Sequence, residues 1–297
     1  MSSASGKWVP GLFVLLWSTG FIGAKLGLPF AEPMTFLALR FGMVAVAMAL
    51  IALFSGAIWP RGWRMIGHVA IVGLLMQTIY LGGVFIGIAH GVPAGLSALI
   101  VGLQPLLTAA LAGLVLGERV RGVQWLGLAL GCVGVALVVG APLLGAAPLD
   151  AREAMSGERL HALGLTCIAL IGITLGTLYQ KKFCTGVDLR AAVAIQNLAG
   201  AASLLPLAFA FETMHITWNT DFVIALTWLC LVLSVGAAML LLLLVRHGAA
   251  AKVASLFYLV PPVTTLIAFL IFGETLTPLA ATGMACAVAG VAVVNLS

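Results

Sequence analysis

Residues 65–117 contain no Asp, Glu, Lys or Arg, and no other feature of the sequence restricts the fold as strongly. Built as one straight α-helix, this stretch would be about 80 Å long, whereas the hydrocarbon core of a bilayer is roughly 30 Å thick. The stretch must therefore fold back on itself, and Ala89-His90-Gly91-Val92-Pro93 is the expected turn. It predicts two adjacent membrane-spanning helices rather than part of a soluble domain.

The scarcity of charge extends over the whole chain of 297 residues, of which 8% are charged and 63% are hydrophobic. An ordinary soluble domain is about half apolar and a quarter charged. This chain has too few charges to cover a surface that faces water, which excludes a soluble globular enzyme and a disordered protein. The fourteen basic residues are spread thinly and form no patch. The lipid bilayer is therefore the expected partner, and no nucleic-acid partner is expected.

The gaps between charges divide the chain into ten apolar segments. Continuous apolar runs indicate helices, because an open sheet cannot stand in lipid and barrel strands would be short and alternating. We therefore predict an all-α membrane protein with ten transmembrane helices. They are expected at residues 8–28, 33–54, 64–88, 93–116, 122–140, 160–180, 189–210, 221–245, 249–272 and 277–296.

Lys and Arg are unevenly distributed between the two ends of these helices. If the N-terminus is cytoplasmic, ten of them fall on the inner side and three fall on the outer side, namely Lys25, Arg152 and Arg159. Cytoplasmic loops are enriched in Lys and Arg. Both termini are therefore expected in the cytoplasm.

An internal repeat relates the two halves of the chain. A shift of 156 residues, without gaps, gives fifteen identities over the forty-five positions 94–138. The matched pairs include Gly20 with Gly176, Pro105 with Pro261, and Gly117-Glu118 with Gly273-Glu274. Each half holds five helices, and this odd number makes the second half enter the membrane from the opposite side. We predict two inverted repeats, at residues 1–145 and 161–297, joined by a linker at 146–160. Secondary transporters commonly have this architecture, with the substrate near the midplane.

Several short motifs resemble a known family. They are Trp17-Ser18-Thr19-Gly20-Phe21, Arg40-Phe41, Gln104-Pro105 and Gly117-Glu118-Arg119, with the Gly-Glu pair recurring at Gly273-Glu274. This pattern resembles the drug/metabolite transporter superfamily and its ten-helix EamA-type exporters. Within them it is most similar to the bacterial exporters of amino acids, in particular the aromatic amino acid exporters. The resemblance implies export across a bacterial inner membrane.

Polar and aromatic side chains within the predicted spans are the candidate substrate-binding residues. Such groups normally face other helices or a cavity when they lie in lipid, and the family resemblance implies a cavity among the helices that carry them. An aromatic, amphipathic pocket suits an amino acid with a large apolar side chain. For the aromatic members, the alternative is anchoring at the membrane interface. The candidates are Trp17, Thr19, Gln77, Tyr80, Gln104, Tyr179 and Tyr258.

Five further residues are candidates for a gating or structural role. Pro105 and Pro261 lie mid-span, where each removes a helical hydrogen bond and could form one of two paired bends. Arg40 lies inside a span, where it could meet a substrate carboxylate or bond to neighbouring helix ends. Glu118 and Glu274 each end a helix at the electrostatically unfavourable terminus. A partner cation or the N-terminus of another helix is expected beside each of them, and a solvated loop carboxylate is the alternative.

Several kinds of site are missing from the sequence. No Asp or Glu falls in the middle of a predicted span, which disfavours proton-coupled export of organic cations. The five cysteines show no CxxC or CxH spacing, so neither a metal nor a cofactor is expected. The sequence contains no HExxH, GxSxG or P-loop pattern, so an enzyme is not expected.

The leading interpretation is an exporter of hydrophobic or aromatic amino acids that works by alternating access. Efflux of drugs or other small metabolites by the same fold is the alternative. The sequence leaves a monomer and a homodimer open.

Overall fold

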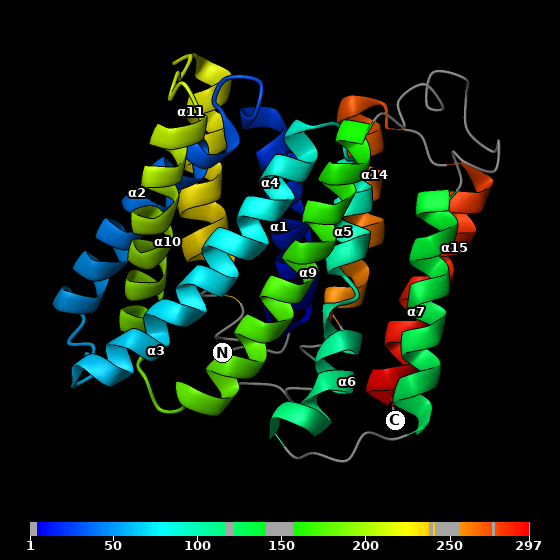
Figure 1. The fold of residues 1–297 in the computed structure, drawn as a ribbon, viewed down its shortest axis with the longest axis horizontal. Coiled ribbons are helices and arrows are strands. Elements are labelled where there is room, and N and C mark those ends of the chain that lie inside the picture. The colour runs from blue at the N-terminus through cyan, green and yellow to red at the C-terminus, as the bar shows by residue number, and fades with distance from the viewer. Residues whose placement is uncertain are drawn as a thin grey trace.

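The structure is a computed structural model that describes residues 5–116, 122–140, 157–237, 240, 256–274 and 277–296. Its helices run side by side through the molecule, and both termini lie at the same end (Figure 1). We call this end the terminal face and the opposite end the distal face.

Five helical rods of alternating direction form the first half. The first two are α1 (Ser5–Gly27) and α2 (Pro33–Phe54). The third is continuous but changes type, from α3 (Trp63–Gly73) through the π-helix η1 (Leu74–Leu81) to α4 (Gly82–Ala89). The fourth is interrupted and consists of α5 (Ala94–Val101) and α6 (Gln104–Leu116), and the fifth is α7 (Gly122–Gly140).

The second half repeats this order. It consists of α9 (Gly157–Phe183), α10 (Leu189–Phe211), α11 (Thr220–Thr227) continued by the π-helix η2 (Trp228–Ala237), the short 3-10 helix η3 (Phe257–Leu259) leading into α14 (Val260–Phe272), and α15 (Pro278–Leu296). The ten rods confirm the predicted fold class. Helix α9 begins at Gly157, three residues before the predicted start of this helix at residue 160. Residues 241–245 and 249–255 of two predicted helices lie outside the part of the chain that the structure describes.

Local sequence signals explain several of the helix ends. Pro33 occupies the first position of α2, where its fixed φ suits a helix and its missing N–H is not needed. Asn219 caps α11 by accepting a hydrogen bond from the Phe222 N–H (2.8 Å). Gly273 ends α14 at a φ of 67°, a left-handed conformation that favours glycine.

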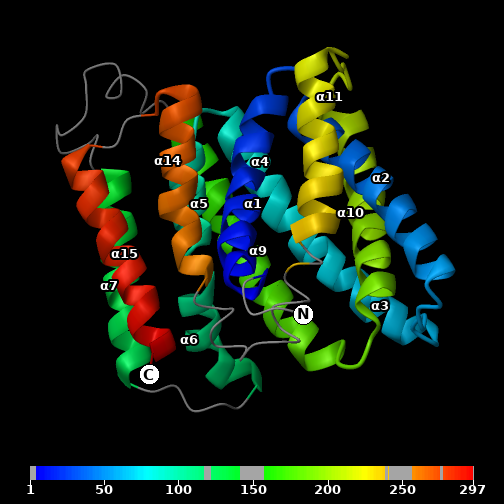
Figure 2. The same ribbon diagram turned by 180° about the vertical axis from the view of Figure 1, so that it is seen from behind.

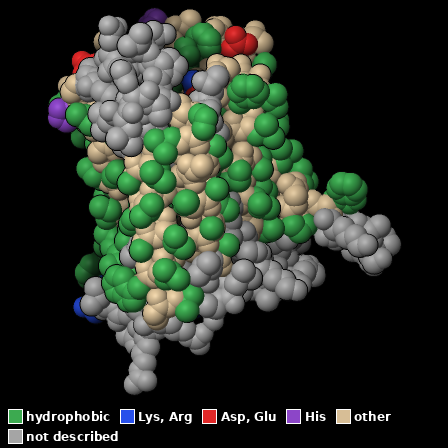
Figure 3. All heavy atoms as spheres, turned by 90° about the vertical axis from the view of Figure 1, so that its right-hand side faces the viewer, with side chains coloured by type: hydrophobic (Ala, Val, Ile, Leu, Met, Phe, Trp, Pro, Cys, Tyr) green, Lys and Arg blue, Asp and Glu red, His purple; other side chains and the backbone are tan. Residues whose placement is uncertain are grey.

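Six described helices are long and apolar enough to cross a membrane. They are Trp8–Gly27, Pro33–Phe54, Trp63–Ala89, Ala94–Leu111, Leu160–Phe183 and Leu189–Phe211. Shorter apolar helices occupy Trp125–Gly134, Thr220–Ser234, Val260–Phe272 and Ala281–Gly290. Hydrophobic side chains cover the flank of the bundle on the side of α7 and α15, and the acidic side chains in view lie at its end (Figure 3). This is the surface expected of a multi-pass membrane protein.

The two halves pack together through helix pairs that the repeat relates, α2 with α10 and α7 with α15 (Figures 1 and 2). A Cβ added at Gly134 of α7 would lie 2.5 Å from the carbonyl oxygen of Gly283. A Cβ at its counterpart Gly290 would lie 2.6 Å from the carbonyl oxygen of Gly127. These glycines allow the two backbones to touch, as small residues do between helices in lipid. The reciprocal contacts are those of two inverted repeats.

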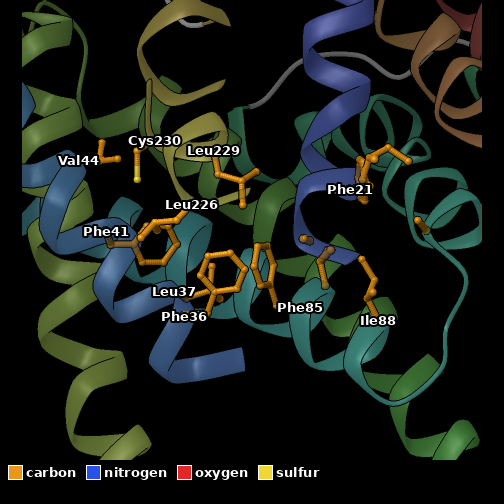
Figure 4. Packing of buried hydrophobic residues seen from close by; sticks show 14 of the residues in the cluster. Phe21, Phe36, Leu37, Phe41, Val44, Phe85, Ile88, Leu226, Leu229 and Cys230 are labelled. Atoms are coloured by element: carbon orange, nitrogen blue, oxygen red, sulfur yellow. The ribbon is translucent and has the colours of Figure 1, made fainter. Parts of the chain in front are cut away.

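Aromatic side chains fill the distal half of the bundle. The ring of Phe36 on α2 packs edge-on against Phe85 of α4, with ring centroids 5.5 Å apart. It also packs against Phe222 of α11 at 5.1 Å. Figure 4 shows Phe36 and Phe85 beside Leu37 and Phe41 in this core. The packed rings join α2, α4 and α11 in the distal half.

Candidate functional site

The two mid-span prolines follow helix interruptions at equivalent places in the repeats. Residues 102–103 form a turn between α5 and α6, and Pro105 is the second residue of α6. In the second half, the 3-10 helix η3 precedes α14, of which Pro261 is the second residue. Proline lacks the N–H that would bond to the carbonyl four residues earlier, and its ring clashes with that carbonyl, so the regular helix breaks in the preceding turn. The interruptions also touch, because a Cβ added at Gly102 would lie 2.8 Å from the Cγ of Pro261.

A junction at the distal face joins α1, α5 and α14. Glu274, which follows α14, forms a hydrogen-bonded ion pair with Lys25 in the last turn of α1. The Glu274 carboxylate also accepts hydrogen bonds from the N–H groups of Ala94 (3.2 Å) and Gly95 (3.5 Å), which begin α5. The positive end of a helix favours a carboxylate, so both expected partners, a cation and a helix N-terminus, lie beside Glu274. We call these four residues the distal latch.

The internal repeat relates Glu274 of the distal latch to a second carboxylate. The shift of 156 residues places Glu118 on Glu274. Glu118 lies outside the described residues, so its predicted gating role stays a prediction.

The α2–α10 pair is tied together at both faces by repeat-related carboxylates. Glu32, before α2, accepts hydrogen bonds from the N–H and the hydroxyl of Thr213, after α10 (both 2.8 Å). Its repeat counterpart Asp188, before α10, accepts a weaker hydrogen bond from the N–H of Ile58, after α2 (3.4 Å). A side-chain hydrogen bond from Arg190 lowers the pKa of Asp188 to about 2. These two contacts hold the pair together at each end.

Arg40 of α2 lies between the two halves and is only 4% exposed. Its Nη2 donates a hydrogen bond to the hydroxyl of Ser234 on η2 (3.3 Å), and its backbone carbonyl accepts from the Cys230 thiol (3.9 Å). Tyr80 of η1 is near enough to interact with it electrostatically. The Nε of Arg40 is buried without a hydrogen-bond partner in the described part of the chain. We call Arg40, Tyr80, Cys230 and Ser234 the Arg40 cluster.

Two π-helical segments flank this cluster at equivalent positions of the repeats. The shift of 156 residues places η1 (Leu74–Leu81) on residues 230–237 of η2. The hydroxyl of Thr78 in η1 bonds to that of Ser203 on α10, and its counterpart Ser234 in η2 bonds to Arg40 on α2. π-Helices are rare and are frequent at functional sites. Sequence reasoning missed the π-helices and Ser234, although the repeat pairs Ser234 with Thr78.

The structure brings some predicted substrate-binding residues close to the Arg40 cluster. Tyr80 belongs to it, and Gln77 packs beside it, since a Cβ added at Gly200 of α10 would lie 2.6 Å from the Cβ of Gln77 and 3.1 Å from the Cδ2 of Phe41. Thr19 of α1 accepts a hydrogen bond from the indole N–H of Trp228, the first residue of η2 (2.8 Å).

Other predicted substrate-binding residues lie in separate contacts. The ring of Trp17 packs against that of Phe257 (5.1 Å between centroids). Gln104, next to the interruption of the fourth rod, donates a hydrogen bond to Thr177 of α9 (3.3 Å). Tyr258 lies in η3, and its side chain is outside the described part of the structure.

Tyr179 is bonded to a residue that sequence reasoning had not selected. Its hydroxyl lies 2.8 Å from the Nδ1 of His68 on α3. The His68 ring stacks on Phe183 with centroids 5.0 Å apart. These side chains lie near the terminal ends of α3 and α9, away from the Arg40 cluster.

A cavity of about 740 Å³ lies along the opposite side of α2 from Arg40. Most of its lining comes from α2, between Thr35 and Leu50, and the rest comes from Leu205, Met214 and Ile216. None of the predicted substrate-binding residues lines it. The cavity is therefore not evidence for the predicted site.

The ten helices, the inverted repeats and the symmetric interruptions define a class of protein, the multi-pass secondary transporters built from inverted repeats. The sequence matches the EamA-like transporter family over residues 11–140 and 161–296. The chain belongs to this family, which consists of transporters and not of enzymes.

Named relatives match nearly the whole chain. It is 29% identical to the uncharacterized transporter YvbV of Bacillus subtilis, covering 95% of this chain and 88% of that protein. It is 28% identical to a protein of Salmonella typhimurium named "Probable amino-acid metabolite efflux pump", covering 94% and 91% of the two chains. It is also 28% identical to the "Probable terminal-alkyne amino-acid exporter" of Streptantibioticus cattleyicolor, covering 99% and 95%.

A solved crystal structure shares the fold. It matches with a TM-score of 0.67 at 21% identity, covering 99% of this chain and 98% of that one. At this identity the likeness concerns the fold alone.

Proposed function

We propose that this protein exports amino acids, in particular hydrophobic or aromatic ones, across a bacterial inner membrane by alternating access. The observation that carries the transport mechanism is the contact between the two helix interruptions, at Gly102 and Pro261. Broken helices at a repeat boundary are where secondary transporters bind their substrates. The choice of amino acids rests on the two relatives that are named for amino-acid efflux or export.

The distal latch supplies a gate for this cycle. Release of substrate at the distal face requires Glu274 to leave Lys25 and the N-terminus of α5. The repeat relates Lys181 to Lys25 and Glu118 to Glu274. We expect Lys181 and Glu118 to form a corresponding gate at the terminal face. The bias of Lys and Arg assigns the terminal face to the cytoplasm. The distal latch then closes the periplasmic exit.

Counterflow in liposomes tests the proposal. Purified protein is reconstituted with unlabelled phenylalanine or methionine inside, and uptake of the labelled amino acid is measured over a broad amino-acid panel, with and without a pH gradient. We expect exchange of the apolar amino acids, which protein-free liposomes lack. Absence of counterflow across the panel would contradict amino-acid export. In that case, lower drug accumulation in cells that produce the protein would favour the alternative, efflux of drugs or other metabolites.

A further inference from the structure

No ion pair with a described residue compensates the positive charge of Arg40. A charge inside a membrane protein needs a partner of opposite charge or a full set of hydrogen bonds, because burial removes the solvation by water. No described carboxylate forms an ion pair with Arg40, and its Nε has no hydrogen-bond partner among the described residues. The one hydrogen bond that its guanidinium makes to Ser234 is to a neutral hydroxyl. Within the described part of the chain, the guanidinium therefore has no anionic partner.

The position of Arg40 is that of a ligand-binding group. It is the eighth residue of α2, about 10 Å along the helix from its distal end. It contacts η2 of the second repeat through Ser234, and it interacts with Tyr80 on η1 of the first. Arg40 therefore contacts η2 directly and lies near Tyr80 of η1, between the two repeats. The midplane between repeats is where substrates of such transporters bind.

We propose that Arg40 binds the carboxylate of the transported substrate, so that a free carboxylate is required for recognition. This inference rests on the proposed transport function and narrows its substrate class. A guanidinium binds a carboxylate through two parallel N–H···O bonds, and the free Nε, with a neighbouring Nη, supplies the two donors. Ser234 acts as a positioning residue because its hydroxyl holds the guanidinium.

Binding of small aromatic probes to the purified protein tests this inference without requiring transport. 3-Phenylpropionate carries the carboxylate alone, phenethylamine carries the ammonium alone, and phenylalanine carries both. We expect 3-phenylpropionate and phenylalanine to bind and to raise the unfolding temperature, and phenethylamine to have no effect. Arg40→Gln should weaken binding of 3-phenylpropionate about tenfold to a hundredfold, the contribution of charged hydrogen bonds. Arg40→Lys should retain part of the affinity, since it keeps the charge but not the paired donors.

Two further variants separate recognition from folding. Arg64→Gln removes the same charge from an exposed position at the terminal end of α3 and should bind like the wild type. Ser234→Ala leaves Arg40 in place and should raise the Kd for 3-phenylpropionate several-fold without making phenethylamine a ligand. If Arg40→Gln does not fold, the Kd of Ser234→Ala for 3-phenylpropionate decides whether Arg40 binds the carboxylate.

The outcomes distinguish this inference from the proposed function. If the wild type binds no carboxylate probe, or if Arg40→Gln and Ser234→Ala both bind 3-phenylpropionate as tightly as the wild type does, Arg40 is not the carboxylate site even where counterflow of amino acids is observed. If Arg40-dependent carboxylate binding occurs without amino-acid counterflow, the inference stands and the proposed cargo is wrong.

Discussion

At the scale of single residues, Glu274 explains how the bundle tolerates a carboxylate at the wrong end of a helix. It lies beyond the negative C-terminus of α14, yet it contacts the positive N-terminus of α5 and the Lys25 ammonium. These interactions offset the repulsion from its own helix, because a charge at a helix end gains or loses only about 0.3–1 kcal/mol, and Glu274 has both a favourable helix end and a cation beside it. The residue is therefore stabilised by two other helices and ties them to its own.

We predict that Glu274→Gln weakens the distal latch by about 1–2 kcal/mol, since it removes an ion pair and a charged acceptor while keeping one neutral oxygen. The distal face should open more often. A cysteine introduced at Ala98, which is buried one turn into α5, should then react faster with a membrane-impermeant maleimide in a background without the native cysteines. Equal labelling rates with and without the Glu274→Gln substitution would contradict the gating role.

The charge swap Lys25→Glu with Glu274→Lys provides the matched control. It restores an ion pair between α1 and α14 but places an ammonium against the positive end of α5. We therefore expect only partial recovery of the slow labelling at position 98. Full recovery would mean that the helix N-terminus contributes nothing to the latch.

The contact of Asp188 that ties α2 to α10 at the terminal face should stabilise the fold in a pH-dependent way. Its pKa of about 2 in the folded protein is lower than the value of about 4 expected in an unfolded chain. The ionised carboxylate therefore stabilises the fold fully above about pH 4, and this stabilisation is lost as the pH falls through about 2.

We predict that Asp188→Asn lowers the unfolding temperature at about pH 6 and that its difference from the wild type shrinks as the pH falls from about 4 towards about 2. Thermal unfolding in an acid-stable detergent measures this. Arg190→Gln also removes the Asp188–Arg190 ion pair. Its difference in unfolding temperature from the wild type should shrink over the same pH range. A difference that stays constant over this range would contradict the assignment.

At the scale of helices, regular α-helix is interrupted by a turn at residues 102–103 before Pro105 and by the 3-10 helix η3 before Pro261. Replacing either proline with alanine returns an N–H donor and lets the helix continue, which can stabilise it by up to about 3 kcal/mol. We predict that Pro105→Ala and Pro261→Ala raise the unfolding temperature and lower kcat for counterflow, with little change in KM. An unchanged kcat with a raised unfolding temperature would show that the interruptions serve packing alone.

The sequence predicted the number and alternating direction of the helices because charge is excluded from the bilayer core. The gaps between charges therefore mark the spans, and the gap at residues 65–117 is long enough for two of them. The sequence also predicted the partners of Glu274, since a carboxylate at a helix C-terminus must be compensated. It could not predict η1 and η2, because the hydrogen-bond register of a helix depends on packing against other helices, such as the Thr78–Ser203 contact. Likewise, no periodicity in the sequence indicates that Tyr179 lies beside His68, to which its hydroxyl is hydrogen-bonded, rather than beside Tyr80.

At the scale of the whole molecule, the described contacts divide the bundle into fixed and movable parts. Carboxylates clamp α2 to α10 at both faces, and backbone contact at glycines joins α7 to α15. The contacts at the distal end of α1, α5 and α14 instead include the ionic and polar distal latch, together with buried apolar side chains of the same helices. We therefore expect the proposed alternating access to involve motion of α1, α5 and α14 relative to the clamped pairs.

This division predicts that covalently joining α5 to α14 at the distal face stops transport. A Cβ added at Gly95 would lie 3.3 Å from the Cβ of Thr265, within a few tenths of an ångström of the separation in a disulfide. We expect Gly95→Cys with Thr265→Cys, in a background without native cysteines, to lose at least about nine-tenths of its counterflow on oxidation, because substrate can no longer leave through the distal face. Dithiothreitol should restore the counterflow, and each single-cysteine variant should be insensitive to oxidant. If the cross-linked protein exchanges substrate as fast as the same protein with both cysteines reduced, the distal face opens elsewhere. In that case α5 and α14 do not belong to the moving part.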